Sequence, residues 1–333
     1  MFTAIEQVHA LPEIAHYWSN KHLIPILQQV GHSSSIEMFR NYIAQLSRER
    51  PREICRVLSV GCGDSASEIN IGQWLIENKI ENFTFECMDI NSEVLERGKR
   101  SVASTGYADK FSFTVFDINA WRPIGKYQII LAIQSLHHFL ELEMLFDKIH
   151  SALDPDGLFL TDDMIGRNGH QRWPEALTSV NALWKELPRE YTYNHSLKRY
   201  EATYENWDCS VDSFEGIRAQ DILPLLVKKF HFDLFVGFGN VIDIFVDRAF
   251  GPNFDPERAW DRNFIDRVHA LDMQQMEQGI VKPTHIQAAM RNRPVENPRF
   301  YKHLTPEFCI RKADPVRFGK LLAFVSSIVA RRS

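Results

Sequence analysis

The chain has 333 residues, of which 44% are hydrophobic and 24% are charged, and its formal net charge is −5. This composition is typical of a globular protein with a large core, and one enlarged domain with additions is expected rather than two equal domains. The acidic balance disfavours a general phosphate-binding surface, so nucleic acid is not expected as a partner.

No segment predicts insertion into a membrane or export. The first residues lack the basic and apolar parts of a signal peptide, and no run of about 18 apolar residues occurs. The five cysteines are scattered and form no CxxC pair, so neither a disulfide framework nor a zinc site is expected. A cytoplasmic location without a membrane partner is therefore expected.

The chain begins with a predicted helical extension, residues 1–50. In "SSSIEMFRNYIAQLSRERP", serines can cap a helix, apolar residues recur at helical spacing, and Pro51 ends the pattern. A central domain is then expected over residues 51–250.

Strands and helices alternate in the first part of this central domain. The predicted strands are "RVLSV", "FTFECMDI", "FSFTVFDI", "YQIILAI" and "LFLTDD", and amphipathic segments between several of them predict helices. This alternation predicts an α/β fold with a mostly parallel, doubly wound sheet. Right-handed crossovers place the carboxyl ends of the parallel strands along one edge, where ligands bind.

The rhythm loosens after the fifth strand. Residues 164–215 are rich in Trp, Tyr, Arg and His and are expected to form an insertion that covers the substrate. "GIRAQDILPLLVKKF" then predicts a helix, and "HFDLFVGFGNVIDIFV" predicts two strands joined by a tight turn. Residues 251–333 are expected to form a helical C-terminal extension.

The stretch "VLSVGCGDSASEI" leads from the first strand through Gly61 and Gly63 into a helix. Glycines let the backbone turn sharply and approach a ligand, and the following helix presents free N–H groups. Asp89 ends the second strand, where a carboxylate can accept both hydroxyls of a ribose. Asp117 ends the third strand, near the expected position of an adenine.

Two classes of cofactor fit this pattern. Gly61, Gly63 and Ala66 match the dinucleotide fingerprint GxGxx[GA], with Asp89 as the ribose-binding acid. The interval between Gly61 and Asp89 is, however, longer than the usual one of about 20 residues. These residues predict a nucleoside-type cofactor and leave a dinucleotide and a sulfonium compound both open.

Several motifs resemble, in order and spacing, those of the class I S-adenosylmethionine-dependent methyltransferases: "VLSVGCGDS", "CMDIN", "FDIN", "YQIILAIQSLHHF" and "ALDPDGLFLTDD". "VGCG" together with "SLHHF" is the specific part, and the resemblance runs over residues 55–163 and on to about 247. Later segments are similar to a bacterial subset associated with glycan or natural-product biosynthesis. The resemblance implies a seven-stranded, mostly parallel Rossmann-like sheet whose last strand is antiparallel.

The resemblance also implies that S-adenosyl-L-methionine is the cofactor and S-adenosyl-L-homocysteine the product. The expected cofactor contacts are Gly61, Cys62, Gly63, Glu68, Asp89, Ile90, Asp117, Ile118 and Gln134. Two positions depart from the family pattern. Ser59 stands where an acidic residue is common, and Ser65 replaces a third glycine. Glu68 is expected to substitute as the polar anchor.

Methyl transfer requires alignment of a nucleophile and exclusion of water, and it requires a base only when the acceptor must lose a proton. His137 and His138 in "QSLHHF" are candidate bases, and packing or helix capping is the alternative role for each. Asp162 and Asp163 close the fifth strand. Because neighbouring strand residues point to opposite faces, one of these aspartates at most is expected to reach the site.

The expected substrate contacts lie at the start of the covering insertion: Arg167, His170, Arg172 and Trp173. Arginines with aromatic rings suit a polar or acidic small acceptor, although these rings could equally pack the insertion onto the sheet. No HxxxH motif or carboxylate cluster indicates a metal, so none is expected.

The sequence therefore predicts a methyltransferase that acts on an O- or N-nucleophile of a small molecule in glycan or secondary-metabolite biosynthesis. One alternative is an NAD(P)-dependent oxidoreductase or epimerase, which would use a Tyr-x-x-x-Lys pair or similar residues for hydride chemistry. The other is a non-catalytic scaffold with the same fold, motivated by Ser59 and Ser65. The acceptor and the oligomeric state, a homodimer included, stay open.

Overall fold

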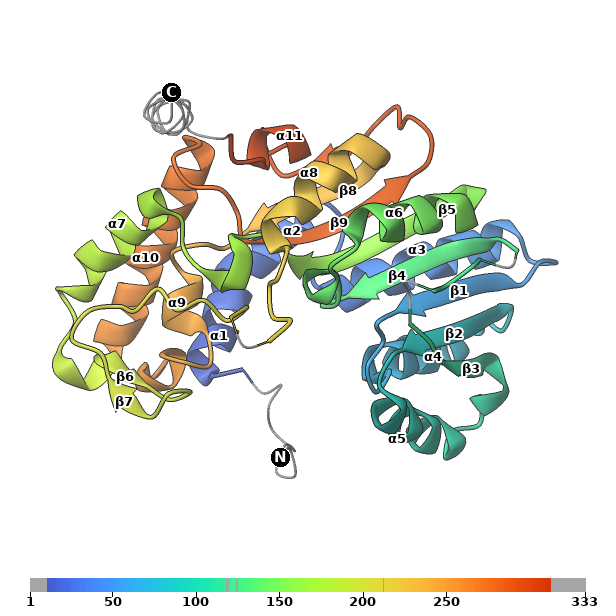
Figure 1. Cartoon of the computed structure of the whole chain (residues 1–333), viewed down its shortest axis with the longest axis horizontal. Coiled ribbons are helices and arrows are strands. Elements are labelled where there is room, and N and C mark those ends of the chain that lie inside the picture. Colours follow the sequence, from blue (N-terminus) through green and yellow to red (C-terminus); the bar gives the residue numbers. More distant parts are fainter. Residues whose placement is uncertain (1–10, 118–119, 124, 212, 313–333) are drawn as a thin grey trace, which may run out of the picture.

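The computed structural model describes residues 11–117, 120–123, 125–211 and 213–312. In this part of the chain, an eight-stranded sheet with flanking helices forms one half of the molecule. A helical half that carries a small two-stranded sheet lies beside it (Figure 1).

Helices precede the sheet, as expected for the described part of residues 1–50. They are α1 (Glu13–Trp18), a π-helical segment (Ser19–Leu23), α2 (Ile24–Gln28) and α3 (Ser35–Glu49). The amino end of α3 is capped because the hydroxyl of Ser34 accepts the N–H of Glu37 at 3.1 Å. Pro51 follows the end of this helix.

The large sheet has the strand order β10-β8-β9-β5-β4-β1-β2-β3. The strands are β1 (Cys55–Val60), β2 (Phe83–Asp89), β3 (Phe111–Val115), β4 (Tyr127–Ile133), β5 (Leu153–Met164), β8 (His231–Phe238), β9 (His285–Arg291) and β10 (Arg299–Phe300). Strands β1 to β5 pair in parallel, which confirms the predicted doubly wound sheet. The eighth strand, beyond the seven expected, is the two-residue β10.

Helices cover the sheet: α4 (Ala66–Glu77), α5 (Ser92–Ala103), α6 (Leu142–Ala152) and α8 (Ala219–Lys229). The connections β1–α4–β2 and β4–α6–β5 lead away from the centre in opposite directions, so right-handed crossovers place α4 and α6 on opposite faces. Helix α3 packs beside α4, and α8 packs beside α6. In the strand order, the chain runs outward from β1 to β2 and β3 on one side and from β4 to β5 on the other. The order thus reverses between β1 and β4, and ligands bind at such a reversal.

The predicted antiparallel strand is present, but the predicted hairpin is wrong. β9 is antiparallel to both of its neighbours, β5 and β8. After β8 the chain turns through Gly239 into α9 (Asp243–Val246) rather than into a strand. The 19-residue helix α10 (Ala259–Glu277) then separates β8 from β9.

A contact from a distant helix explains why the second half of the expected hairpin is helical. The fully buried carboxylate of Asp272, on α10, accepts the N–H groups of Val241 and Ile242 at 3.1 and 3.3 Å. These N–H groups lie just before α9, so the carboxylate satisfies donors that a helix start leaves free.

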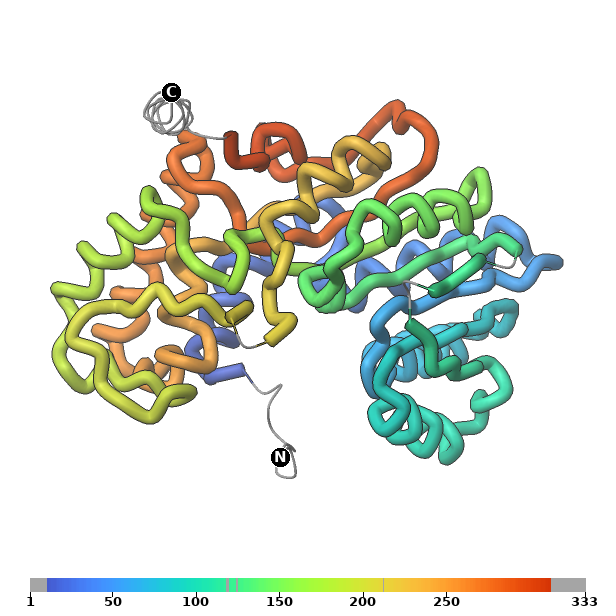
Figure 2. Tube along the Cα trace, viewed as in Figure 1, coloured from blue at the N-terminus to red at the C-terminus, as the bar shows by residue number. Residues whose placement is uncertain are grey.

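The strand β9 lies within residues 251–333, the segment expected to be helical, so the sheet continues beyond residue 250. The C-terminal part of the described chain ends in α11 (Pro306–Cys309), which contacts α8 and β8. Figure 2 shows this last segment lying against α8. The division into 1–50, 51–250 and 251–333 stays a proposal.

The second half of the molecule combines the covering insertion with residues from the C-terminal part. It contains α7 (Pro174–Trp184), β6 (Tyr193–Asn194), β7 (Arg199–Tyr200), α9 and α10 (Figure 1). Trp184 contacts Tyr204 and Phe250 in its core. No helix in the described ranges has both the length and the apolar character needed to cross a membrane.

Candidate functional site

The turn after β1 packs tightly against the loop after β4. Gly61 and Gly63 have φ values of +69° and +56°, in the left-handed region that favours glycine. A Cβ atom on Gly61 would lie 2.8 Å from the Cβ of Ser135. The hydroxyl of Ser135 also donates to the carbonyl of Val60 at 2.9 Å. Gly61 is therefore required for the close approach of the two loops.

Asp89, at the carboxyl end of β2, faces this turn. Its Oδ2 accepts the N–H of Gly63 at 2.9 Å, and its Oδ1 accepts the N–H of Asn91 at 2.8 Å. The half-buried carboxylate keeps further lone pairs for the hydroxyls of a ribose. The next residue, Ile90, is 72% exposed, and Val115 at the end of β3 is 51% exposed. The carboxylate of Asp89 can bind the ribose of a nucleoside, and the exposed side chains of Ile90 and Val115 can contact its base.

The other expected cofactor contacts have different surroundings. Cys62 is half-buried between the two glycines, and Asp117 is exposed after β3. Gln134 is exposed after β4, and its amide donates to Oδ1 of Asp162 at 3.1 Å. Ile118 lies outside the described residues. Contacts of these residues with a cofactor stay predictions.

Ser59 and Glu68 form a buried pair. The hydroxyl of Ser59 donates to Oε1 of Glu68 at 2.5 Å, and both side chains are almost completely buried. Burial raises the pKa of Glu68 to about 7. The carboxyl that was expected to anchor the cofactor therefore has a partner within the protein, and its contact with a cofactor stays a prediction.

Asp163 holds the loop that follows β4. This fully buried carboxylate accepts the N–H groups of Ser135 and Leu136 at 2.8 and 2.7 Å, and it lies 2.6 Å from Nδ1 of His137. Asp162 is half-buried and contacts Gln134 instead. Asp163 is thus enclosed by its contacts with this loop, and a catalytic role for either aspartate stays a prediction.

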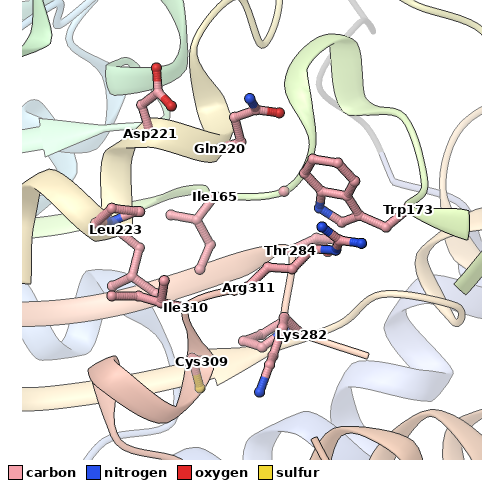
Figure 3. A pocket seen from close by; sticks show the side chains of 13 residues that line it. Ile165, Trp173, Gln220, Asp221, Leu223, Lys282, Thr284, Cys309, Ile310 and Arg311 are labelled. Atoms are coloured by element: carbon pink, nitrogen blue, oxygen red, sulfur yellow. The ribbon is translucent and has the colours of Figure 1, made fainter. Parts of the chain in front are cut away.

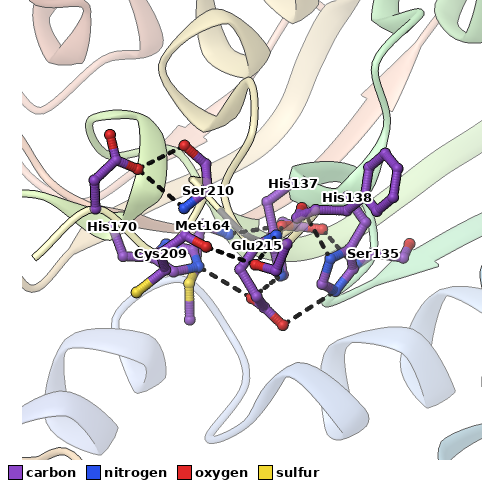
Figure 4. A network of polar contacts seen from close by, with 12 residues as sticks. Ser135, His137, His138, Met164, His170, Cys209, Ser210 and Glu215 are labelled. Carbon is purple, nitrogen blue, oxygen red and sulfur yellow. Dashed lines mark hydrogen bonds and ion pairs between the residues drawn. The ribbon is translucent and has the colours of Figure 1, made fainter.

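A glutamate that sequence reasoning missed completes a cluster around His137 (Figure 4). Oε2 of Glu215 lies 3.2 Å from Nε2 of His170 and 3.6 Å from Nε2 of His137. Its Oε1 lies 4.0 Å from Nε2 of His138. We name these four residues the histidine–glutamate cluster. Glu215 is far from the histidines in sequence, and no spacing pattern links them.

The carboxylates of Asp163 and Glu215 stabilise a positive charge on the His137 imidazole. Burial alone would lower the pKa of His137, but the hydrogen bond with Asp163 and the nearby carboxylate of Glu215 outweigh burial and raise it to about 9. The neighbouring imidazoles of His137 and His170 hold the pKa of Glu215 well below its usual range. Burial and the neighbouring His137 lower the pKa of His138.

Arg172, an expected substrate contact, is buried in an ion pair. Its Nη2 lies 3.2 Å from Oδ2 of Asp243, and its Nη1 donates to the carbonyl of His170 at 3.0 Å. The same Asp243 oxygen accepts the hydroxyl of Thr284 at 2.5 Å. Arg172 thus joins the covering insertion to the start of β9, and its contact with a substrate stays a prediction.

Trp173 lines a separate cavity of about 270 Å³ between the end of β5, α8 and the segment around α11. Trp173 and Arg311 stand at the same end of this cavity (Figure 3). The guanidinium of Arg311 lies 4.3 Å from the centre of the Trp173 ring, and that of Arg167 lies 5.3 Å from it. Of the four expected substrate contacts, His170 is the one that joins the cluster.

The chain matches a known family over residues 34–205, just over half of its length. The matching family model is described as a methyltransferase domain. The chain belongs to this methyltransferase family. Its membership confirms the predicted class I methyltransferase and the predicted cofactor, S-adenosylmethionine.

The methyltransferase domain also has a curated relative. A malonyl-[acyl-carrier protein] O-methyltransferase from Ilyobacter polytropus is 27% identical over 133 residues, which cover 40% of this chain and 48% of that protein. The chain thus matches about half the length of this relative.

Among solved structures, similar chains are also methyltransferases by description. The O-methyltransferase of a trans-AT polyketide synthase multienzyme from Brevibacillus brevis is 14% identical, with a TM-score of 0.45 over 89% of this chain and 82% of that chain. A plantazolicin methyltransferase is 15% identical, with a TM-score of 0.41 over 84% of this chain and 90% of that chain.

Within the methyltransferase domain, the cofactor turn and the histidine–glutamate cluster are neighbours. Gly61 of the turn approaches Ser135, and His137 and His138 follow Ser135 by two and three residues. Both groups lie at the carboxyl ends of parallel strands, on either side of the point where the strand order reverses.

Proposed function

We propose that this chain transfers a methyl group from S-adenosylmethionine to a hydroxyl or amine of a small-molecule acceptor in glycan or secondary-metabolite biosynthesis. One observation carries the proposal: the turn that fits a nucleoside cofactor touches the loop that carries His137 and His138 of the histidine–glutamate cluster. A donor bound at the turn would therefore stand next to groups that can handle a proton.

When bound, S-adenosylmethionine supplies a methyl group on a positively charged sulfur. Asp89 would hold the ribose hydroxyls, and Ile90 and Val115 would offer apolar surface to the adenine. The N–H groups at the start of α4 would face the amino-acid end of the cofactor, whose carboxylate suits a helix amino terminus. Gly63 leaves room there, since a Cβ atom on it would meet only Val94, at 3.9 Å.

The cluster supports an acceptor that must lose a proton. His138 is its exposed histidine, and we assign to His138 the proton that leaves the acceptor. Asp163 and His137 would hold the loop in place. A carboxylate acceptor has no proton to lose, so the cluster favours a hydroxyl or an amine. The name of the curated relative, a malonyl-[acyl-carrier protein] O-methyltransferase, supports oxygen as the methylated atom, although a malonyl group offers a carboxylate and not a hydroxyl.

Calorimetric titration of the full chain with S-adenosylmethionine, S-adenosylhomocysteine and NADH tests the proposal. We expect both sulfur compounds to bind and NADH not to bind. Asp89→Ala should weaken the binding of S-adenosylmethionine by about 10- to 100-fold, because charged hydrogen bonds to the ribose are lost. Asp109→Ala, at an exposed aspartate, should leave the binding unchanged.

The other outcomes identify the alternatives. Binding of NADH alone would support an oxidoreductase, and binding of none of the three would support a scaffold. Equal binding by wild type and Asp89→Ala would show that the ribose anchor is misassigned. A cytoplasmic location stays a prediction.

A further inference from the structure

Two histidines of the cluster aim the same ring nitrogen at the same oxygen. Nε2 of His137 and Nε2 of His170 lie 3.6 and 3.2 Å from Oε2 of Glu215 (Figure 4). All three donor atoms lie within 4.8 Å of one another. They come from three separate segments: the loop after β4, the short helical turn Asn168–His170 and the loop before α8.

The surroundings of His137 are those of a metal-binding histidine. Its Nδ1 lies 2.6 Å from Asp163, whose other bonds to backbone N–H groups keep the carboxylate in place. A hydrogen bond from Nδ1–H to a carboxylate leaves the lone pair of Nε2 free, and metal-ligating histidines usually have such a partner. With the proton on Nδ1, the lone pair of Nε2 faces Oε2 of Glu215 at 3.6 Å, and a cation between the two atoms would be bound by both.

The distances within the cluster agree with a shared ion. At 3.6 Å, the contact between His137 and Glu215 is too long for an N–H···O hydrogen bond. Two ligand atoms that each lie about 2.0–2.1 Å from a tetrahedral ion are about 3.3 Å apart, between the two measured distances. Two carboxylates, Asp163 and Glu215, give the cluster a local excess of negative charge when its imidazoles are neutral.

We propose that His137, His170 and Glu215 bind one divalent transition-metal ion. Two imidazoles and a carboxylate suit ions such as Zn²⁺ and leave a coordination position open. The side chain of Glu215 is 50% exposed, so an ion can reach the site from solvent. This site was not expected from the sequence, which lacks a metal-binding spacing.

The role of the ion rests on the proposed function. A hydroxyl of the acceptor that occupies the open position would lose its proton more readily, because a divalent ion stabilises the alkoxide. The proton would pass to His138, whose Nε2 lies 4.0 Å from the other oxygen of Glu215. The ion would thus select acceptors that carry a hydroxyl.

Titration of the tag-free, chelator-treated full chain with ZnCl₂, followed by calorimetry, tests the site. We expect one tight ion per chain, and we expect Glu215→Gln and His170→Ala each to weaken its binding at least tenfold, because each removes one of three ligands. His16→Ala removes an exposed histidine of α1 and should leave the affinity unchanged. X-ray data collected at the zinc absorption edge should place the ion at the cluster.

The proposal is wrong if wild type binds no tight ion, or if Glu215→Gln and His170→Ala bind Zn²⁺ as wild type does. Titration of the same samples with S-adenosylmethionine separates the two proposals. Cofactor binding without zinc binding overturns the metal site alone. Zinc binding without cofactor binding overturns the proposed function and leaves the metal site standing.

Discussion

At the scale of single residues, a buried carboxyl group from α4 lies against the end of β1, next to the turn at Gly61 and Gly63. The resemblance to class I methyltransferases implies an acidic residue two positions before the first glycine, where this chain has Ser59. Here the carboxyl group comes from Glu68, on the first turn of α4, and Ser59 donates to it. The pair therefore places a carboxyl group in contact with this position of β1, and the helix supplies it.

Glu68→Gln should change how stability depends on pH. The pKa of Glu68 is about 7 in the folded chain, against an ordinary value of 4.5, so the folded state binds more protons between these values. The free energy of unfolding contributed by this group therefore falls as pH rises from about 4.5 to 7. Between pH 5 and pH 8, wild type should lose about 2 kcal/mol more than Glu68→Gln.

Urea unfolding of the cofactor-free proteins at pH 5, 6, 7 and 8 measures this difference. Other buried carboxyls, such as Asp272, titrate in both proteins and cancel in the comparison. If the free energy of unfolding changed with pH in the same way in both proteins, Glu68 would have its ordinary pKa in the folded chain, which would contradict the prediction.

At the scale of elements, backbone hydrogen bonds connect the covering insertion to the loop after β4 that carries His137. The N–H of Gly169 donates to the carbonyl of Gly216 at 2.9 Å, and the N–H of Ile217 donates to the carbonyl of His137 at 3.1 Å. Glu215 and His170 are therefore placed by the two ends of the insertion, which meet beside β4. The position of the cluster depends on this meeting.

Gly169→Ala should disturb the meeting of these two segments. Gly169 has a φ of +64°, and a Cβ atom there would lie 3.0 Å from the backbone nitrogen of Cys209 and closer still to Asp208. We expect the free energy of unfolding to fall by about 1–3 kcal/mol. Binding of S-adenosylmethionine should persist, because the turn after β1 is untouched.

Gly106→Ala is the matched control, since a Cβ atom at Gly106 meets nothing within 4 Å. Chemical denaturation of both variants, together with calorimetry, provides the two measurements. If both variants were equally stable, the insertion would tolerate movement at Gly169.

At the scale of the whole molecule, the amino-terminal helices are fastened to α10. Asp266 on α10 accepts from Lys21 and His22 at 2.7 Å each and from the hydroxyl of Tyr17 at 3.1 Å. The helix α1 also contacts α9. The beginning of the described chain thus supports the half of the molecule that is built mostly from residues after 164.

Asp266→Ala should loosen this attachment. The carboxylate is partly exposed but has three partners, so its loss should lower the free energy of unfolding by about 1 kcal/mol. Asp147→Ala removes an exposed aspartate that pairs with Lys229 and should have a much smaller effect. Thermal unfolding followed by circular dichroism compares them, and equal midpoints would contradict a special role for Asp266.

Local patterns explain which parts of the fold could be predicted. The strands β1, β2, β4 and β5 are largely buried runs bounded by turn residues, and the turn after β1 contains two glycines, Gly61 and Gly63, one residue apart. The hairpin failed because Val241 and Ile242 are apolar and β-branched, whereas the capping carboxylate that favours a helix comes from Asp272, about thirty residues later. The strand propensity of Val241 and Ile242 carries no information about Asp272, the distant residue that accepts their N–H groups.

The sequence by itself determined the parallel sheet, the turn after β1 and Asp89 beside it, because alternating hydrophobicity and strand-end position depend on neighbouring residues. Only the tertiary structure decided that Glu215 and His170 meet His137, that Arg172 is held by Asp243, and that β9 lies between β5 and β8. These contacts join residues far apart in the chain. Packing brings the residues of the cluster together because both ends of the insertion lie beside the carboxyl end of β4. A cluster made in this way has no characteristic spacing in the sequence.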